Sequence, residues 1–180
     1  MPTDPVPQRL EQQVRVLQII VGALMFGVVS FGVVAIVIGT GRQGDGDSPI
    51  WMIAAGFAVM MLIARQIMGV SMVNSIRRQI AKGSWQPRNK GGVPAFPADA
   101  TDADRLLAML QTVTIVQCAL PEGAAFFNLI AYIINGHVAS LLMVAVLLLW
   151  MSSSFPTRER VVNWIGRQLE LVELERGQPS

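Results

Sequence analysis

Long apolar runs alternate with short polar segments along the chain, and the first run covers residues 16–38. Its 23 positions include no charged side chain. A helix rises about 1.5 Å per residue, so this run reaches about 35 Å, whereas the hydrocarbon core of a bilayer is about 30 Å thick. The pattern therefore predicts a membrane-spanning helix, within a longer helix that begins near Gln8.

Three more apolar runs predict three further spans, which we place at about 50–70, 106–134 and 138–155. A helix satisfies its own backbone hydrogen bonds, so it is the form that such a run takes in lipid. The sequence therefore predicts an all-α integral membrane protein. It is expected to be a four-transmembrane-helix bundle that forms a single membrane domain over residues 1–180.

Polar segments separate the predicted spans. Residues 39–49 and 135–137 predict two short turns, and residues 83–105, which hold three prolines, predict a longer loop. Charged residues follow the second span, so we expect its helix to continue as an amphipathic extension as far as residue 82.

The charged segment 158–176 also has the periodicity of a helix. Its apolar residues share one side of that helix: Val161, Val162, Ile165, Leu169 and Val172. A helix with one apolar and one charged face lies on a membrane surface or against a partner. We therefore expect a cytoplasmic amphipathic helix after each pair of spans.

The basic residues indicate an orientation. Of the 14 Lys and Arg residues, only Arg42 falls in the two short turns. Positive charge concentrates on the cytoplasmic side of a membrane. We therefore place both turns outside, and the two termini with the 83–105 loop in the cytoplasm, as in a multi-pass protein of the plasma (inner) membrane.

Composition agrees with lipid as the main partner and argues against several functions. Charged residues make up 14% of the chain, whereas soluble domains carry about 25%. One cysteine and one histidine cannot form a disulfide or the usual His/Cys metal site within one chain. The sequence also has no phosphate-binding glycine loop and no nucleophile elbow. We therefore expect no enzyme, cofactor, metal, nucleic-acid partner or small-molecule substrate.

The chain is similar to itself at two places. Residues 23–38 match residues 119–134 at six of 16 positions, and residues 73–79 match residues 162–168 at five of seven. Both pairs fall in the same order, and both copies start inside, so the copies would be related by an axis along the membrane normal. We therefore predict two parallel helical-hairpin repeats, at 8–82 and 106–176.

The first match places a stripe of mostly small residues on the first helix of each repeat. Residues four apart share one helix face, and small residues let two helices approach closely in lipid. We expect the first and third spans to cross near Gly27 and Gly123. The two stripes are Ala23, Gly27, Phe31 and Ala35, and Ala119, Gly123, Phe127 and Ala131.

Glu122 is the most unusual residue of the predicted spans. It lies about 18 Å from the outer end of the third span, where an ionised carboxylate is costly. Pro121 precedes it and invites a kink. Its possible partners are Arg65 and three residues on roughly its own face: Gln111, Thr114 and Cys118.

Three interpretations of Glu122 stay open. It hydrogen-bonds its neighbours or pairs with Arg65, it carries protons or binds a cation, or a bend in the span brings it to the interface. Arg65 has a simpler interpretation of its own, in which its side chain extends to the inner headgroups. Asn128 and Tyr132, one turn apart, are expected to serve interhelical hydrogen bonding.

The stretch Ala119–Gly123, with Phe126, Phe127 and Ala131, resembles the carboxylate helix of rotary-ATPase proteolipid (c-type) subunits. That resemblance implies that Glu122 is an ion-binding acid in a homo-oligomer. The chain also resembles small four-span bacterial membrane proteins, which implies a fold and no activity. The leading hypothesis is a scaffold or interaction subunit of a membrane assembly. The alternative is a proton- or cation-binding, proteolipid-like subunit.

Overall fold

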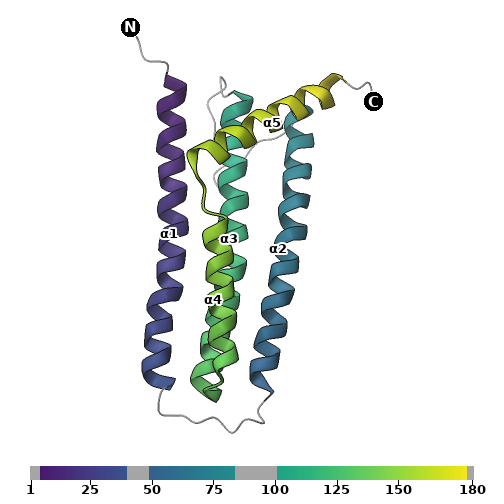
Figure 1. The fold of residues 1–180 in the computed structure, drawn as a ribbon. Helices are drawn as coiled ribbons and strands as arrows, with labels where there is room; N and C mark the ends of the chain where they lie inside the picture. Colours follow the sequence, from purple (N-terminus) through teal and green to yellow (C-terminus); the bar gives the residue numbers. More distant parts are fainter. Residues whose placement is uncertain (1–4, 40–48, 84–100, 178–180) are drawn as a thin grey trace, which may run out of the picture. The chain divides into compact units, whose positions relative to one another are not determined.

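A computed structural model describes residues 5–39, 49–83 and 101–177, and within these ranges every regular element is an α-helix (Figure 1). In chain order they are α1 Pro5–Gly39, α2 Ile50–Ala81, α3 Asp102–Asn135, α4 Val138–Ser153 and α5 Arg158–Gly177. The all-α prediction is therefore confirmed for the described residues. Arg42 and most of the predicted 83–105 loop lie outside them.

Three of these helices are long and apolar enough to cross a membrane, at Glu11–Gly39, Ile50–Ala81 and Asp102–Asn135. The fourth predicted span is shorter than expected, because α4 has 16 residues and reaches only about 24 Å. It meets the same test only together with α5, from which it is bent by 66°. The chain therefore has three candidate spans, or four if the bent pair counts as one.

The helix ends follow local sequence signals. Before α3, the Thr101 hydroxyl accepts the Asp104 N–H at 3.3 Å, while the Asp104 carboxylate accepts the Thr101 N–H at 3.0 Å. This reciprocal pair is a capping box. Pro156 lies in the break between α4 and α5, where its ring cannot continue the first helix. At the other end of the chain, α1 begins at Pro5, three residues before the predicted start.

The helices divide into two compact units. The first unit holds Met1–Val16, Gly69–Thr114 and Pro156–Ser180, and the second holds Leu17–Met68 and Ile115–Phe155. Each unit takes segments from both halves of the chain, so neither coincides with one of the proposed repeats. The repeat organisation stays a prediction.

In the second unit, α3 contributes more to the core than any other helix. Its buried side chains there are Ala124, Ala125, Leu129 and Tyr132, and they meet Val28 and Ala35 of α1, Ala58 of α2, and Val144 and Leu147 of α4. Four of these nine residues are alanines, so the helix backbones can approach one another closely. The core of this unit therefore has α3 as its common partner.

The other helices of the second unit leave many large apolar side chains uncovered. The most exposed on α1 and α4 are Phe26 and Leu149, both at 72%, and the most exposed on α2 is Ile67 at 65%. A soluble protein rarely leaves so much contiguous apolar surface in water, whereas lipid covers it without cost. This surface is compatible with a membrane protein.

In the first unit, α5 buries its apolar face against the chain's own helices. Val172 packs with Ile80, Leu106 and Met109, and a neighbouring cluster joins the α5 residues Val161 and Ile165 to Val14 and Leu107. The sequence predicted that this face would lie on a membrane or a partner. For Val161, Ile165 and Val172 that expectation is wrong, because residues of α1, α2 and α3 cover them, whereas Val162 of the same predicted face is 46% exposed.

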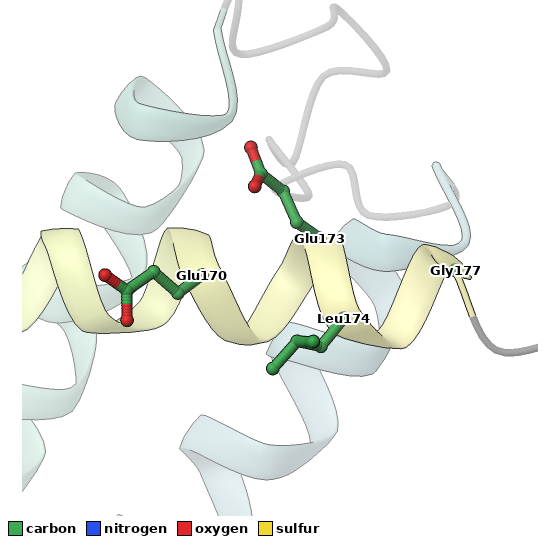
Figure 2. Close-up of a pocket in the computed structure, with 4 residues that line it drawn as sticks. All are labelled: Glu170, Glu173, Leu174 and Gly177. Carbon is green, nitrogen blue, oxygen red and sulfur yellow. The ribbon is translucent and has the colours of Figure 1, made fainter.

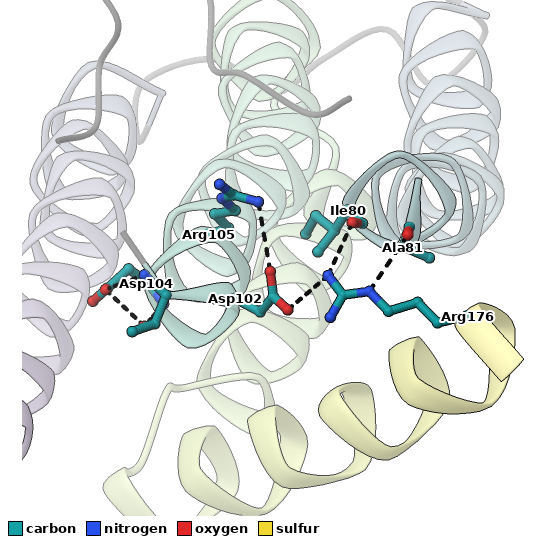
Figure 3. Close-up of polar contacts among 7 residues, drawn as sticks. Ile80, Ala81, Asp102, Asp104, Arg105 and Arg176 are labelled. Carbon is teal, nitrogen blue, oxygen red and sulfur yellow. Dashed lines mark hydrogen bonds and ion pairs between the residues drawn. The ribbon is translucent and has the colours of Figure 1, made fainter. Parts of the chain in front are cut away.

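Arginine contacts fasten the end of α5 (Figure 3). The Arg176 guanidinium contacts the Asp102 carboxylate at 2.8 Å and donates at 3.4 Å to the carbonyls of Ile80 and Ala81. Carbonyls at a helix C-terminus lack helical partners, so a cation there is favourable. About one helical turn before Ile80 on α2, the guanidinium of Arg77 pairs with the carboxylate of Glu175 on α5 at 2.8 Å. Both apolar packing and ion pairs therefore hold α5 on the other helices of the first unit.

Candidate functional site

Polar side chains inside the second unit are the candidates for function, and Asn128 of α3 is the most deeply buried. Its side-chain amide donates to the carbonyl of Ala54 on α2 at 3.1 Å and to that of Ala124 at 2.9 Å. Asn128 is fully buried. The predicted interhelical hydrogen bonding is confirmed for Asn128 and stays a prediction for Tyr132, and the role that the Asn128 bond supports is packing of α3 on α2.

Glu122 lies against α1 and has no polar partner among the described residues. A methyl group on Gly27 would lie 3.9 Å from Glu122 Oε1, at ordinary contact distance. The carboxylate is half-buried. The ion pairs within the described ranges leave Glu122 out, so the predicted pairing with Arg65 is not formed.

Arg65 of α2 is bound instead at the end of α4. Its Nη2 donates to the hydroxyl of Ser154 at 2.7 Å, and that hydroxyl lies 3.2 Å from the carbonyl of Trp150, to which it donates. The C-terminus of a helix carries partial negative charge, which explains how a buried cation is held without a carboxylate. Arg65 is only 5% exposed, so its side chain does not extend freely to the headgroups.

Of the remaining predicted partners, Cys118 lies one turn before Glu122 on α3, whereas Gln111 and Thr114 lie two to three turns before it. Cys118 is buried in the second unit, where it packs with Val21 and Met151. Gln111 and Thr114 belong to the first unit and are half-buried there. Among the described residues, no three His, Cys, Asp or Glu side chains gather closely enough to hold a metal ion. Apart from the absent Arg65 pair, the predicted site around Glu122 stays a prediction.

The predicted crossing of α1 and α3 is only half right. Gly27 faces Glu122 and Phe126 of α3, whereas a methyl group on Gly123 would meet nothing within 4 Å. Neighbouring helix positions are about 100° apart, so Gly123 points away when Glu122 points at α1. The contact on α3 continues through Leu129 and Tyr132, and not along the predicted stripe.

The other stripe residues divide between the core and the surface. Ala35 and Ala131 are buried, whereas Ala23 and Ala119 are exposed. The aromatic members make edge-on contacts. The ring pairs are Phe31 with Phe126 at 5.4 Å, and Phe127 with Phe57 at 5.2 Å.

His137 forms a site in the turn before α4 that sequence reasoning missed. Its Nδ1 accepts the N–H of Ala139 at 3.2 Å, which caps α4. Its ring stacks on Trp51 of α2, with centroids 4.7 Å apart and planes 10° apart. Histidine is an uncommon capping residue, so only the turn at Gly136 was predictable there, and the φ of Gly136 is 64°.

We expect His137→Ala to lower the free energy of unfolding by about 1 kcal/mol, because the cap is lost. His137→Asn is the matched control, since asparagine also caps helices but cannot stack like an imidazole. Thermal unfolding in mild detergent compares the two. Equal losses in both variants would mean that the hydrogen bond to Ala139 does not stabilise α4.

A surface hollow of about 550 Å³ lies beside α5, lined by Glu170, Glu173, Leu174 and Gly177. Figure 2 shows that the two carboxylates extend away from each other and do not converge on a common point. Leu174 is 65% exposed. The hollow therefore presents a mixed acidic and apolar outer surface of the first unit, and not an assembled ligand site.

No known protein family, curated protein or solved structure matches this chain.

Proposed function

We propose that this chain is a multi-pass membrane protein that serves as a scaffold or interaction subunit of a membrane assembly. Its helices would cross the plasma (inner) membrane, with both termini on the cytoplasmic side. The two halves would be parallel repeats, and the partner would be another membrane subunit or a second copy of the chain.

The way α5 is packed carries this proposal. Its apolar residues Val161, Ile165 and Val172 are buried inside the first unit, and Arg77–Glu175 and Arg176–Asp102 hold its end in place. Its opposite side is exposed and presents Leu174 together with charged residues: Glu159, Arg167, Glu170 and Glu173. A rigid charged surface beside membrane helices suits recognition of a partner.

The polar groups of the spans support the same proposal. Arg65 and Asn128 are used in contacts with the chain's own helices, on Ser154 and on Ala54. Side chains committed in this way fix how helices pack. They leave no converging acid, base and nucleophile within the described ranges on which to build a reaction.

Cross-linking tests the proposal. A photo-reactive amino acid in place of Glu170 should give discrete products with one membrane partner or a second copy, identified by mass spectrometry. The same amino acid in place of buried Ile165 is the control and should give only products within the chain. Glu170→Arg combined with Glu173→Arg should abolish the partner product when the photo-reactive group is at Glu159. Identical products from positions 170 and 165 would contradict the proposal.

Ion binding by Glu122 is a second candidate, favoured by the absence of a polar partner for this carboxylate among the described residues. An unpaired acid inside a span is a functional candidate by default. A hydrophobic carbodiimide should then modify Glu122, and Glu122→Gln should abolish the modification. Protection by sodium or by raised pH would support ion binding, whereas modification that neither condition changes would contradict it.

A further inference from the structure

We propose that Arg65 and Ser154 form a binding site for a phosphate group, supplied by an anionic phospholipid of the inner leaflet or by free phosphate. The inference rests on the membrane location in the proposed function, but not on the scaffold role. It concerns the end of α4, at which both side chains meet.

The charge of Arg65 is the first step. The guanidinium is always protonated, and it is 5% exposed. No carboxylate of the described residues lies within ion-pair distance of it, because the ion pairs there involve other residues. The end of α4 supplies only a partial negative charge. A buried cation in an apolar surrounding favours a full counter-ion.

The donors of Arg65 are the second step. Nη2 is occupied by Ser154 at 2.7 Å, whereas Nη1 is buried and has no hydrogen-bond partner. A guanidinium presents parallel N–H groups in a planar fork whose geometry matches two oxygens of one phosphate. Of the two terminal nitrogens of the guanidinium, Nη2 therefore already binds an oxygen and Nη1 lacks an acceptor.

Access is the third step. Ser154 is half-buried, and Ser152 and Ser153 beside it are exposed, so one hydroxyl separates the guanidinium from the surface. Arg65 lies 15 residues beyond Ile50, about 22 Å along a helix that crosses a core of about 30 Å. Its contact with Ser154, just beyond the last residue of α4, directs the guanidinium toward the predicted inner end of that helix. A phosphate there would accept from Nη1, and the Ser154 hydroxyl would donate to it by turning its single proton away from the Trp150 carbonyl.

Ligand-induced thermal stabilisation in a nonionic detergent tests the site, since a ligand that binds the folded state raises Tm. The probes are short-chain phosphatidylglycerol, inorganic phosphate, and a diacylglycerol of the same chain length, which has no phosphate. We expect phosphatidylglycerol to raise Tm by several degrees and diacylglycerol to leave it unchanged. A rise with inorganic phosphate alone would assign the site to free phosphate, whereas a rise only with the lipid would assign it to a headgroup.

The variants separate this site from nonspecific charge. Arg65→Gln should abolish the rise in Tm, and Ser154→Ala should weaken it. Arg65→Lys retains the charge without the fork and should need about tenfold more lipid for the same rise, which keeps the test valid if the Gln variant does not fold. Arg167→Gln, an exposed cation of α5, should respond like the unmodified chain. Equal responses of the Arg65 and Arg167 variants, or a rise with diacylglycerol, would overturn the site while leaving the membrane location intact.

Discussion

Met60→Arg should lower the stability of the chain in a bilayer by about 3 kcal/mol, which is among the two largest effects that this structure predicts. Met60 is 52% exposed on α2 and lies 10 residues beyond Ile50, about 15 Å along the helix. That depth is the middle of a hydrocarbon core of about 30 Å, where a guanidinium has no water to solvate it. In an aqueous environment the same exposed substitution would cost almost nothing.

Met60→Leu is the matched control, because it conserves volume and polarity at the same position. Glu173→Arg, on the exposed side of α5, tests whether a new arginine is tolerated elsewhere. Thermal unfolding in lipid nanodiscs compares the three variants. A loss for Met60→Arg that is no larger than the loss for Met60→Leu would show that this face of α2 does not meet lipid.

Gly39→Ala is expected to destabilise the second unit by about 1–3 kcal/mol through overpacking. The added β-carbon would lie 2.6 Å from Cε1 of Tyr132, closer than non-bonded carbons approach each other. The Tyr132 ring is 8% exposed and belongs to the core, so it cannot swing away freely. Because φ of Gly39 is not positive, the cost comes from this contact and not from the backbone.

Two comparisons isolate the contact between Gly39 and Tyr132. Gly56→Ala adds a methyl group that meets nothing within 4 Å, so it should be neutral or stabilising by up to about 1 kcal/mol. Tyr132→Leu removes the ring atoms that collide, so Gly39→Ala should cost less in that background, as a double-mutant cycle would measure. Equal costs of Gly39→Ala in both backgrounds would contradict the close packing of α1 on α3.

Helix positions were predictable because they depend on local patterns. Apolar runs and the polar segments between them placed the elements within a few residues of where the structure has them. The length of α4 was less predictable. Ser154 ends its last turn through the bond from its N–H to Met151, and an apolar run does not reveal such an early stop.

The partners of polar residues were not predictable, because they depend on how helices rotate against one another. The repeat predicted that Gly123 contacts α1. A shift of one residue turns a helix position by about 100°, and in the structure it is Glu122 that faces Gly27. The sequence offered Glu122 as a partner for Arg65 because opposite charges at similar depth attract. In the structure, Arg65 binds the end of α4 instead. The partial charge of a helix end comes from the backbone, so the identity of a single residue does not reveal it as a partner for a cation.

We infer that these apolar helices cross a bilayer with both chain ends on the cytoplasmic side. Cysteine labelling measures on which side of the membrane each position lies. In a Cys118→Ser background, Ser48→Cys and Ser180→Cys each provide one thiol, in the predicted outer turn and at the C-terminus. A membrane-impermeant maleimide should label position 48 in intact bacterial cells, and position 180 only after permeabilisation. Equal labelling of both positions in intact cells, or recovery of the chain in the soluble fraction without detergent, would contradict the account.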